Sequence, residues 1–167
     1  ITNSATGTWT GSVGSTTGTI TNLGAWNATA SGTPGITAGI ANSGTFNQNG
    51  GSITGNISNA GNFNLNADTG ATGGTFFNGN AVYSPVLGGT GNLTYTGNRT
   101  LGAALVNNGF ITANPGVASA SSQTMTVTGA MSGTGTINSV VDGNGASRVT
   151  VNGVSSGAQT FTFTNQT

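Results

Sequence analysis

The sequence has almost no ionisable side chains. Its 167 residues include no cysteine and no histidine, and only 2 are basic and 2 acidic. The basic residues are Arg99 and Arg148, so lysine is absent too. Without histidine or cysteine the chain cannot form a Ser–His–Asp or Cys–His catalytic arrangement. Without lysine it cannot complete a P-loop, and two arginines are too few to neutralise a nucleic-acid backbone.

Long apolar runs are also missing. No segment approaches the ~20 apolar residues of a membrane-spanning helix, and no basic stretch precedes an apolar one as in a signal peptide. The repeating pattern is already under way at Ile1–Asn3, so we interpret the sequence as a fragment of a longer protein. Hydrophobic residues make up 34% and are spaced along the chain, which argues against disorder.

Much of the chain follows a repeated phrase. Ile40–Phe46 and Ile57–Phe63 both read I-x-N-x-G-x-F, and Ile20–Trp26 differs only in its final tryptophan. Leu105–Ile111 repeats the phrase loosely. In each copy an apolar residue ends one strand, Asn and Gly form a bend, and a large apolar residue begins the next strand. A repeat of about 20 residues is typical of a solenoid.

Residues between the bends alternate between apolar and polar. Phe63 and Leu65 share one side of a strand, whereas Asn64 and Asn66 point to the other. This period of two predicts strands, and the 31 glycines are too frequent for helix interiors. We therefore expect an all-β chain, a right-handed parallel β-helix of about eight coils and roughly 40 Å in length.

The asparagines of the phrase are expected to stack. Equivalent residues of successive coils lie above one another in a parallel β-helix, and an asparagine side chain both donates and accepts hydrogen bonds. Turn chemistry alone would also explain part of the Asn-x-Gly pattern. The ladder is predicted for Asn22, Asn42, Asn59 and Asn107.

The C-terminal residues depart from the phrase. Val149–Val151 and Phe161–Phe163 alternate with polar residues and are interpreted as hairpin-like strands, with a turn at Asn152–Gly153 between them and one at Asp142–Gly145 before them. We divide the chain into coils at 1–128 and a module at 129–167 that continues the same solenoid.

This module carries a family resemblance. Ser147–Gly157 followed by Thr160–Phe163 resembles the module that closes many autotransporter passenger domains, and Leu87–Leu101 is similar to a glycine-rich repeat of that class. The family usually has Asp where this chain has Ser147. The resemblance implies a right-handed parallel β-helix, exported through the outer membrane of a Gram-negative bacterium. It also implies that the C-terminal module acts as an autochaperone.

Parallel β-helices include enzymes that cleave polysaccharides, so the positions of the carboxylates bear on whether this chain could be such an enzyme. Asp68 and Asp142 are the only two, and the coil spacing separates them by roughly 18 Å along the axis. Paired glycosidase carboxylates lie about 5–9.5 Å apart. We therefore predict no enzyme activity, and no catalytic, cofactor-binding or metal-binding residue.

The expected function is that of an autotransporter passenger fragment, secreted or exposed at the outer-membrane surface. It would act as an adhesin or as a self-association module in aggregation and biofilm. The alternative is a structural stalk or extracellular filament subunit without its own ligand. The expected partners are other copies of the chain, with host or matrix surface molecules as a second class. We expect no contact of this fragment with nucleic acid or membrane.

The C-terminal module is also the expected folding nucleus. Its hairpin contacts would be close in sequence, so closing their loops would cost little entropy. The candidate residues are Val149, Val151, Phe161 and Phe163.

We predict that deleting 129–167 impairs refolding of the remainder, whereas deleting 1–30 leaves a folded, shorter rod. A solenoid propagates only after a first coil is ordered, so loss of the nucleus affects all coils. Val151→Asp or Phe161→Asp should likewise slow refolding more than Val13→Asp. Refolding rates after dilution from denaturant measure these effects, and equal rates for the two deletions would contradict the prediction.

Overall fold

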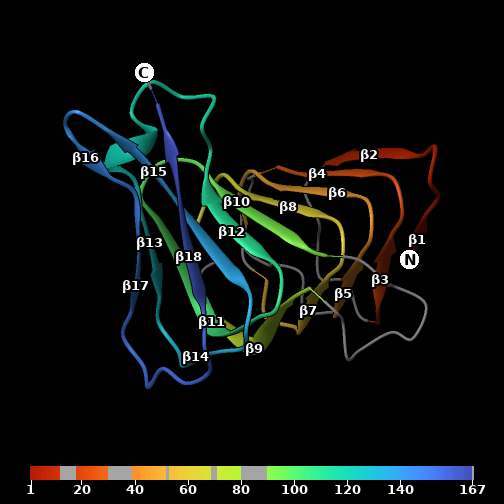
Figure 1. Cartoon of the computed structure of the whole chain (residues 1–167). Coiled ribbons are helices and arrows are strands. Elements are labelled where there is room, and N and C mark those ends of the chain that lie inside the picture. The colour runs from red at the N-terminus through yellow and green to blue at the C-terminus, as the bar shows by residue number, and fades with distance from the viewer. Residues whose placement is uncertain (12–17, 30–38, 52, 69–70, 80–89, 167) are drawn as a thin grey trace.

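The computed structural model shows an elongated all-β molecule whose strands wind around one core (Figure 1). The structure describes residues 1–11, 18–29, 39–51, 53–68, 71–79 and 90–166. Their strands form two sheets of nine strands each. All pairings between these strands are parallel except one short antiparallel pair, in which Val141 and Asp142 lie opposite Ala146 and Gly145.

Each sheet gains one strand for every turn of the chain. The first sheet contains, in spatial order, β1 (Thr2–Asn3), β3 (Ile20–Asn22), β5 (Ile40–Asn42), β7 (Ile57–Asn59), β9 (Ala71–Asn78), β11 (Arg99–Asn107), β13 (Thr124–Val127) and β17 (Arg148–Val151), with β14 (Met131–Ser132) beside β11. The second sheet contains β2 (Thr8–Gly11), β4 (Ala25–Ala28), β6 (Thr45–Gln48), β8 (Asn62–Leu65), β10 (Asn92–Tyr95), β12 (Phe110–Ala113), β15 (Thr136–Asp142) and β16 (Gly145–Ala146), with β18 (Thr160–Asn165) beside β15. A short 3-10 helix, η1 (Ala120–Ser122), precedes β13.

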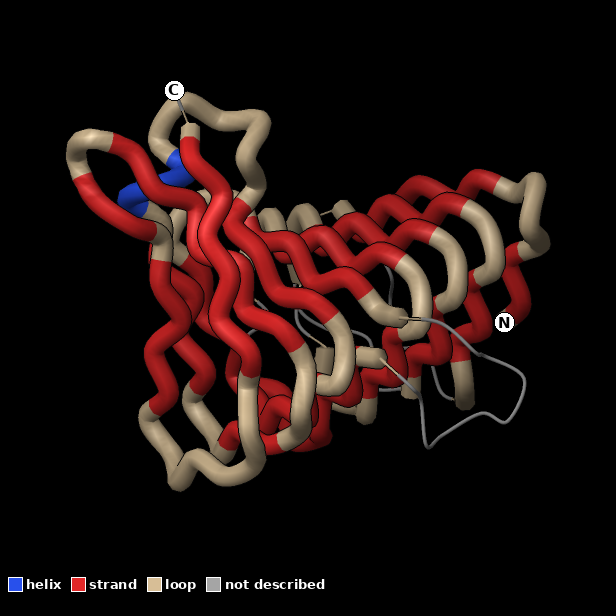
Figure 2. The backbone as a smooth tube through the Cα atoms, viewed as in Figure 1, coloured by secondary structure: helices blue, strands red, loops and turns tan. Residues whose placement is uncertain are grey.

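From β1 to β12 the strands alternate between the two sheets in chain order, and Figure 2 shows the resulting stack of coils. The predicted parallel β-helix is therefore confirmed, and the strand order gives eight coils. The strands from β3 to β8 have three or four residues, because each one ends where the chain bends toward the other sheet.

The coils become larger toward the C-terminus. Hydrogen-bonded asparagines of adjacent coils are 17 to 20 residues apart in the first four steps and 29 apart in the fifth. Farther on, Asn138 is 26 residues from both Thr112 and Thr164. The larger coils have a third side, because β11 pairs with β13 through Arg99–Leu101 and with β14 through its second half.

Inward side chains stack into columns along the axis. Trp26, Phe46 and Phe63 are fully buried in register on neighbouring strands. The ring centroids of Trp9 and Trp26 are 4.2 Å apart, and those of Phe46 and Phe63 are 5.0 Å apart. Burying each such side chain contributes about 1.5–3 kcal/mol, and stacked aromatic pairs add to this. Aliphatic residues continue the column as Leu93, Ile111 and Ile137.

The glycine of the repeated phrase is required by the close approach of neighbouring coils. A Cβ atom added at Gly44 would collide with the carbonyl oxygen of Gly24, and one added at Gly61 would collide with that of Gly44. These glycines do not have a positive φ, so space and not backbone conformation excludes a side chain. The carbonyl of Gly24 also accepts a hydrogen bond from the N–H of Thr45 at 2.9 Å, which ties the two coils together at this corner.

The C-terminal residues continue both sheets. The turn at Asp142–Gly145 does join an antiparallel hairpin, β15 with β16. The expectation that Val149–Val151 and Phe161–Phe163 form a hairpin together is wrong. β17 pairs in parallel with β13, and β18 pairs in parallel with β15, so the two strands belong to different sheets. The alternating pattern correctly predicts two strands, but it carries no information about which strand is the neighbour of each.

Ser147 closes the base of the β15–β16 hairpin. Its Oγ accepts a hydrogen bond from the N–H of Val140 at 2.9 Å, and its own N–H donates to the carbonyl of Val140 at 2.8 Å. Ser147 is buried, and its neutral hydroxyl bonds to the backbone of Val140 without the desolvation cost that the carboxylate of an aspartate would have here. Val13, and residues 87–89 of the glycine-rich segment, lie outside the described part of the chain.

We predict that Gly44→Ala lowers the free energy of unfolding by about 1–3 kcal/mol, because the coils must separate to admit the methyl group. Gly39 in the same coil is the matched control. A Cβ there would lie 3.6 Å from its nearest contact, the carbonyl oxygen of Asn56, which is ordinary packing. Thermal unfolding of both variants tests this, and equal midpoints would show that the corner yields without cost.

Candidate functional site

A ladder of buried asparagines runs along the corner between the two sheets. The side-chain N–H of Asn22 donates to Oδ1 of Asn42 at 2.7 Å, and Asn42 donates to Asn59 at 2.8 Å. Asn59 donates to Asn78 at 2.9 Å, and Asn78 donates to Asn107 at 2.9 Å. All five side chains are fully buried. The structure thus places the four predicted asparagines in one column, all with the same orientation.

The second N–H of these side chains crosses the corner. Asn22 donates to the carbonyl of Thr45 at 2.9 Å, and Asn42 donates to the carbonyl of Asn62 at 2.9 Å. Each acceptor belongs to the following coil and to the second sheet. Both donor hydrogens and the acceptor oxygen are therefore used within the protein, so the ladder is a structural element and offers nothing to a ligand.

The ladder is longer than the repeated phrase indicated. Asn3 begins it and Gln159 ends it. Asn78 could have been found, since residues 76–79 read Phe-Phe-Asn-Gly, but the phrase is interrupted after that point. The sequence does not indicate Gln159 as a ladder residue, because it lies outside every copy of the repeated phrase. It lies 52 residues from Asn107, whose side chain donates to its Oε1 at 2.7 Å, and Gly133 lies at the ladder position between them.

The ionisable groups do not converge on a site. Oδ1 of Asp68 accepts a hydrogen bond from the backbone N–H of Thr100 at 2.8 Å. Asp142 accepts one from the N–H of Asn144 at 2.7 Å, at the exposed tip of the hairpin. The carboxylate of Asp142 accepts hydrogen bonds from the side chain of Ser121 and from the backbone of Asn144, and these bonds lower its pKa. Asp142 thus stabilises the turn of the hairpin, whereas Asp68 bonds to the backbone of a residue 32 positions away.

The other titratable groups are equally isolated. The hydroxyl of Tyr95 donates to the carbonyl of Arg148 at 3.2 Å, and burial raises the pKa of Tyr95. Nη1 of Arg99 donates to the neighbouring carbonyl of Asn98. Within the described ranges, no three carboxylates, histidines or cysteines come together as metal ligands would.

The outer face of the second sheet is more distinctive. Its strands are in register, so one outward position in each forms a continuous line, which we call the outer row. Asn47 donates to Asn27 and Asn64 donates to Asn47, both at 2.6 Å, while Asn27 donates to Oγ1 of Thr10. The outer row comprises Thr10, Asn27, Asn47, Asn64, Thr94, Thr112, Asn138 and Thr162.

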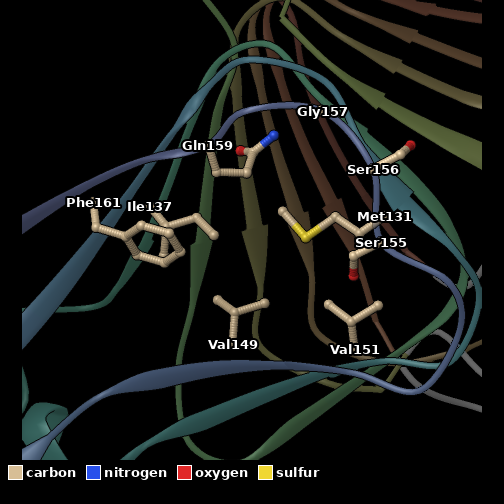
Figure 3. A pocket seen from close by; sticks show the side chains of 9 residues that line it. All are labelled: Met131, Ile137, Val149, Val151, Ser155, Ser156, Gly157, Gln159 and Phe161. Carbon is tan, nitrogen blue, oxygen red and sulfur yellow. The ribbon is translucent and has the colours of Figure 1, made fainter.

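The C-terminal coil leaves apolar side chains at the surface. Phe161 is 63% exposed and Phe163 is 70% exposed, whereas Val149 and Val151 are partly buried against the core. A cavity of about 270 Å³ lies between the last coils (Figure 3). Its lining residues are Met131, Ile137, Val149, Val151, Ser155, Ser156, Gly157, Gln159 and Phe161. The folding-nucleus candidates thus lie on the strands of the last coil, in register with residues of the coil before it, and their kinetic role stays a prediction.

Comparisons with protein-family models, curated proteins and solved structures found no match to this chain. In the described part of the chain, no helix has the length and apolar character needed to cross a membrane.

We predict that Asn42→Leu lowers the free energy of unfolding by about 1–3 kcal/mol, because the buried amides above and below lose partners. Asn92→Leu is the matched control. Asn92 lies on an exposed strand position, where its side chain donates to Oδ1 of Asn62 at 3.0 Å. Chemical denaturation of both variants measures the difference, and equal losses would count against a special role for the buried ladder.

Proposed function

We propose that this chain is a passenger segment of a Gram-negative autotransporter, secreted or held at the cell surface, that mediates adhesion by self-association. The observation that carries the proposal is the outer row with the neighbouring polar positions of the second sheet. Together they form a face of amides and hydroxyls without a charged residue at the row positions.

This face suits contact through many weak interactions. The hydrogen bonds between Asn27, Asn47 and Asn64 hold their side chains in place before any partner arrives. Ordered side chains lose less entropy on binding than free ones do. Because the positions repeat along the rod, many weak contacts form together when two such faces meet, and their combined affinity is high. The absence of charge leaves no long-range repulsion between identical faces.

We propose a second copy of the chain as the partner, since two such faces have the same chemistry and the same coil spacing. Amides and hydroxyls both donate and accept, so either face can satisfy the other. Host or matrix surface molecules rich in hydroxyl groups would be recognised by the same chemistry. The second candidate function is a stalk without its own ligand, which the fully satisfied inner ladder favours because it rigidifies the rod.

The test is clustering of beads coated with the chain. We predict that Thr94→Lys combined with Thr112→Lys reduces clustering by about tenfold or more, because repeated charges repel across a multivalent contact. The matched control is Thr126→Lys with Thr150→Lys. These threonines occupy equivalent outward positions on β13 and β17, on a different side of the rod.

Clustering of the parent should change little between low and high salt, since so few charges are present to be screened. Beads that stay dispersed with the parent chain would overturn self-association and favour the stalk. Equal losses in both double variants would show that charge anywhere on the rod is enough, and that the outer row has no special part.

A further inference from the structure

The chain contains five Asn-Gly pairs, in which an asparagine side chain can react with the backbone of the residue that follows it. Because glycine has no Cβ, its nitrogen can approach the Cγ atom of the preceding asparagine closely. The pairs are Asn49–Gly50, Asn78–Gly79, Asn108–Gly109, Asn144–Gly145 and Asn152–Gly153. The fold places these asparagines in different surroundings, so we expect them to react at different rates.

The buried ladder protects Asn78. Its side chain is fully buried and donates to Oδ1 of Asn107 and to the carbonyl of Phe110, both at 2.9 Å. The N–H of Gly79 donates to the carbonyl of Asn59 at 2.8 Å. A reaction between the two groups would break these hydrogen bonds in the interior of the protein, which is costly.

Three other pairs are restrained by neighbouring coils. Oδ1 of Asn49 accepts a hydrogen bond from the side chain of Asn66 at 2.9 Å, and Oδ1 of Asn108 accepts one from the N–H of Thr134 at 3.1 Å. The N–H of Gly153 donates to a backbone carbonyl of the coil before it at 3.2 Å. In each of these pairs, either the asparagine side chain or the glycine nitrogen is bound to another coil.

Asn144 lies in a different setting, in the turn of the β15–β16 hairpin that projects from the stack of coils (Figure 1). Residues 143–145 are exposed. The N–H of Gly145 donates to Oδ1 of Asp142 at 3.1 Å, and the N–H of Asn144 donates to the same oxygen at 2.7 Å. The nitrogen that would attack the side chain of Asn144 is therefore already bonded to a carboxylate.

The carboxylate of Asp142 is placed to carry a proton. Hydrogen bonds, above all that from the side chain of Ser121, lower the pKa of Asp142 and so favour its ionised form, which accepts hydrogen bonds. The weakest of these donors is the side-chain amide of Asn144. Asp142 thus bonds both to the nitrogen that would lose a proton and to the amide that would leave.

We infer that Asn144 converts spontaneously to aspartate and isoaspartate, with the carboxylate of Asp142 transferring the proton. The nitrogen of Gly145 forms a bond to Cγ of Asn144 and gives its proton to Asp142. The bond between Cγ and Nδ2 breaks, Asp142 returns the proton to Nδ2, and ammonia leaves. Water then opens the succinimide ring at either carbonyl. One asparagine and one water thus give one acidic residue and one ammonia, and nothing is oxidised or reduced.

The conversion changes the charge of an almost uncharged chain. The sequence has 2 basic and 2 acidic residues, so a new carboxylate leaves an excess of one negative charge. Isoaspartate also lengthens the main chain at Asn144, between the paired residues Asp142 and Gly145. The inference goes beyond the proposed self-association and does not depend on it, because the outer row has no part in the reaction.

The test follows each asparagine while the whole chain is incubated at neutral pH in water enriched in heavy oxygen. Mass spectrometry of peptides measures the converted fraction, and the heavy oxygen marks carboxylates that form during the incubation. We predict that Asn144 converts about tenfold or more faster than the exposed Asn108, because a carboxylate accepts the N–H of Gly145. Equal rates at the two asparagines would overturn the inference.

Two glycines of the turn offer a matched pair of variants. A Cβ at Gly145 would lie 3.8 Å from its nearest contact, the carbonyl oxygen of Ser121, and a Cβ at Gly143 would have nothing within 4 Å. Gly145→Ala should slow the conversion by about tenfold or more, because the methyl group hinders the approach of the nitrogen to Cγ. Gly143→Ala should leave the rate unchanged. Conversion of Gly145→Ala at the rate of the parent would contradict the proposed attack.

Asp142→Ser tests the proton transfer. A serine hydroxyl still accepts hydrogen bonds within the turn but is a far weaker base than a carboxylate. Conversion at Asn144 should slow by about tenfold or more. A rate equal to or above that of the parent would show that exposure alone sets the rate, and would remove Asp142 from the mechanism. Asn78 should stay unconverted in every variant, since the substitutions are confined to the exposed turn, and its conversion at the rate of Asn144 would contradict protection by the ladder.

Discussion

The structure depends on one corner, where the asparagine of the repeated phrase joins three pieces of backbone. Its side chain bonds to the equivalent asparagine of the next coil and to a carbonyl of the second sheet, as Asn42 does with Asn59 and Asn62. Gly44, two residues later, has no side chain to keep the coils apart. Together these residues fix both the spacing and the register of successive coils, since a slip by one residue would bury an unpaired amide.

The rest of the architecture follows from that register. Because each coil begins its second strand at the same height, Trp26, Phe46 and Phe63 fall into one column and bury one another. The coils can grow from 17–20 residues to 26 or more without losing alignment, because additional residues form the third side while the corner stays in place. Where Gly133 interrupts the ladder, Gln159 reaches back to Asn107 with its longer side chain.

The coils are held together by hydrogen bonds of side-chain amides and of the backbone, and not by ion pairs. The surface can therefore be almost free of charged residues. Neighbouring coils are aligned by uncharged groups, so the outer row can remain neutral over the whole length of the second sheet. Such a face can lie against a copy of itself without charge repulsion. In the part of the chain that the structure describes, no three carboxylates, histidines or cysteines come together. The activity that we propose for this molecule is contact with another surface.

The sequence by itself determined the fold class, the coil period and the stacking of Asn22, Asn42, Asn59 and Asn107, because these depend on a local pattern that recurs. Its alternation also located the strands. It did not determine which strands become neighbours at the C-terminus, where β17 and β18 separate into different sheets. It likewise did not reveal Gln159 as the end of the ladder, or the larger three-sided coils. These features arise from contacts between residues many positions apart, and only the three-dimensional path of the chain brings such residues together.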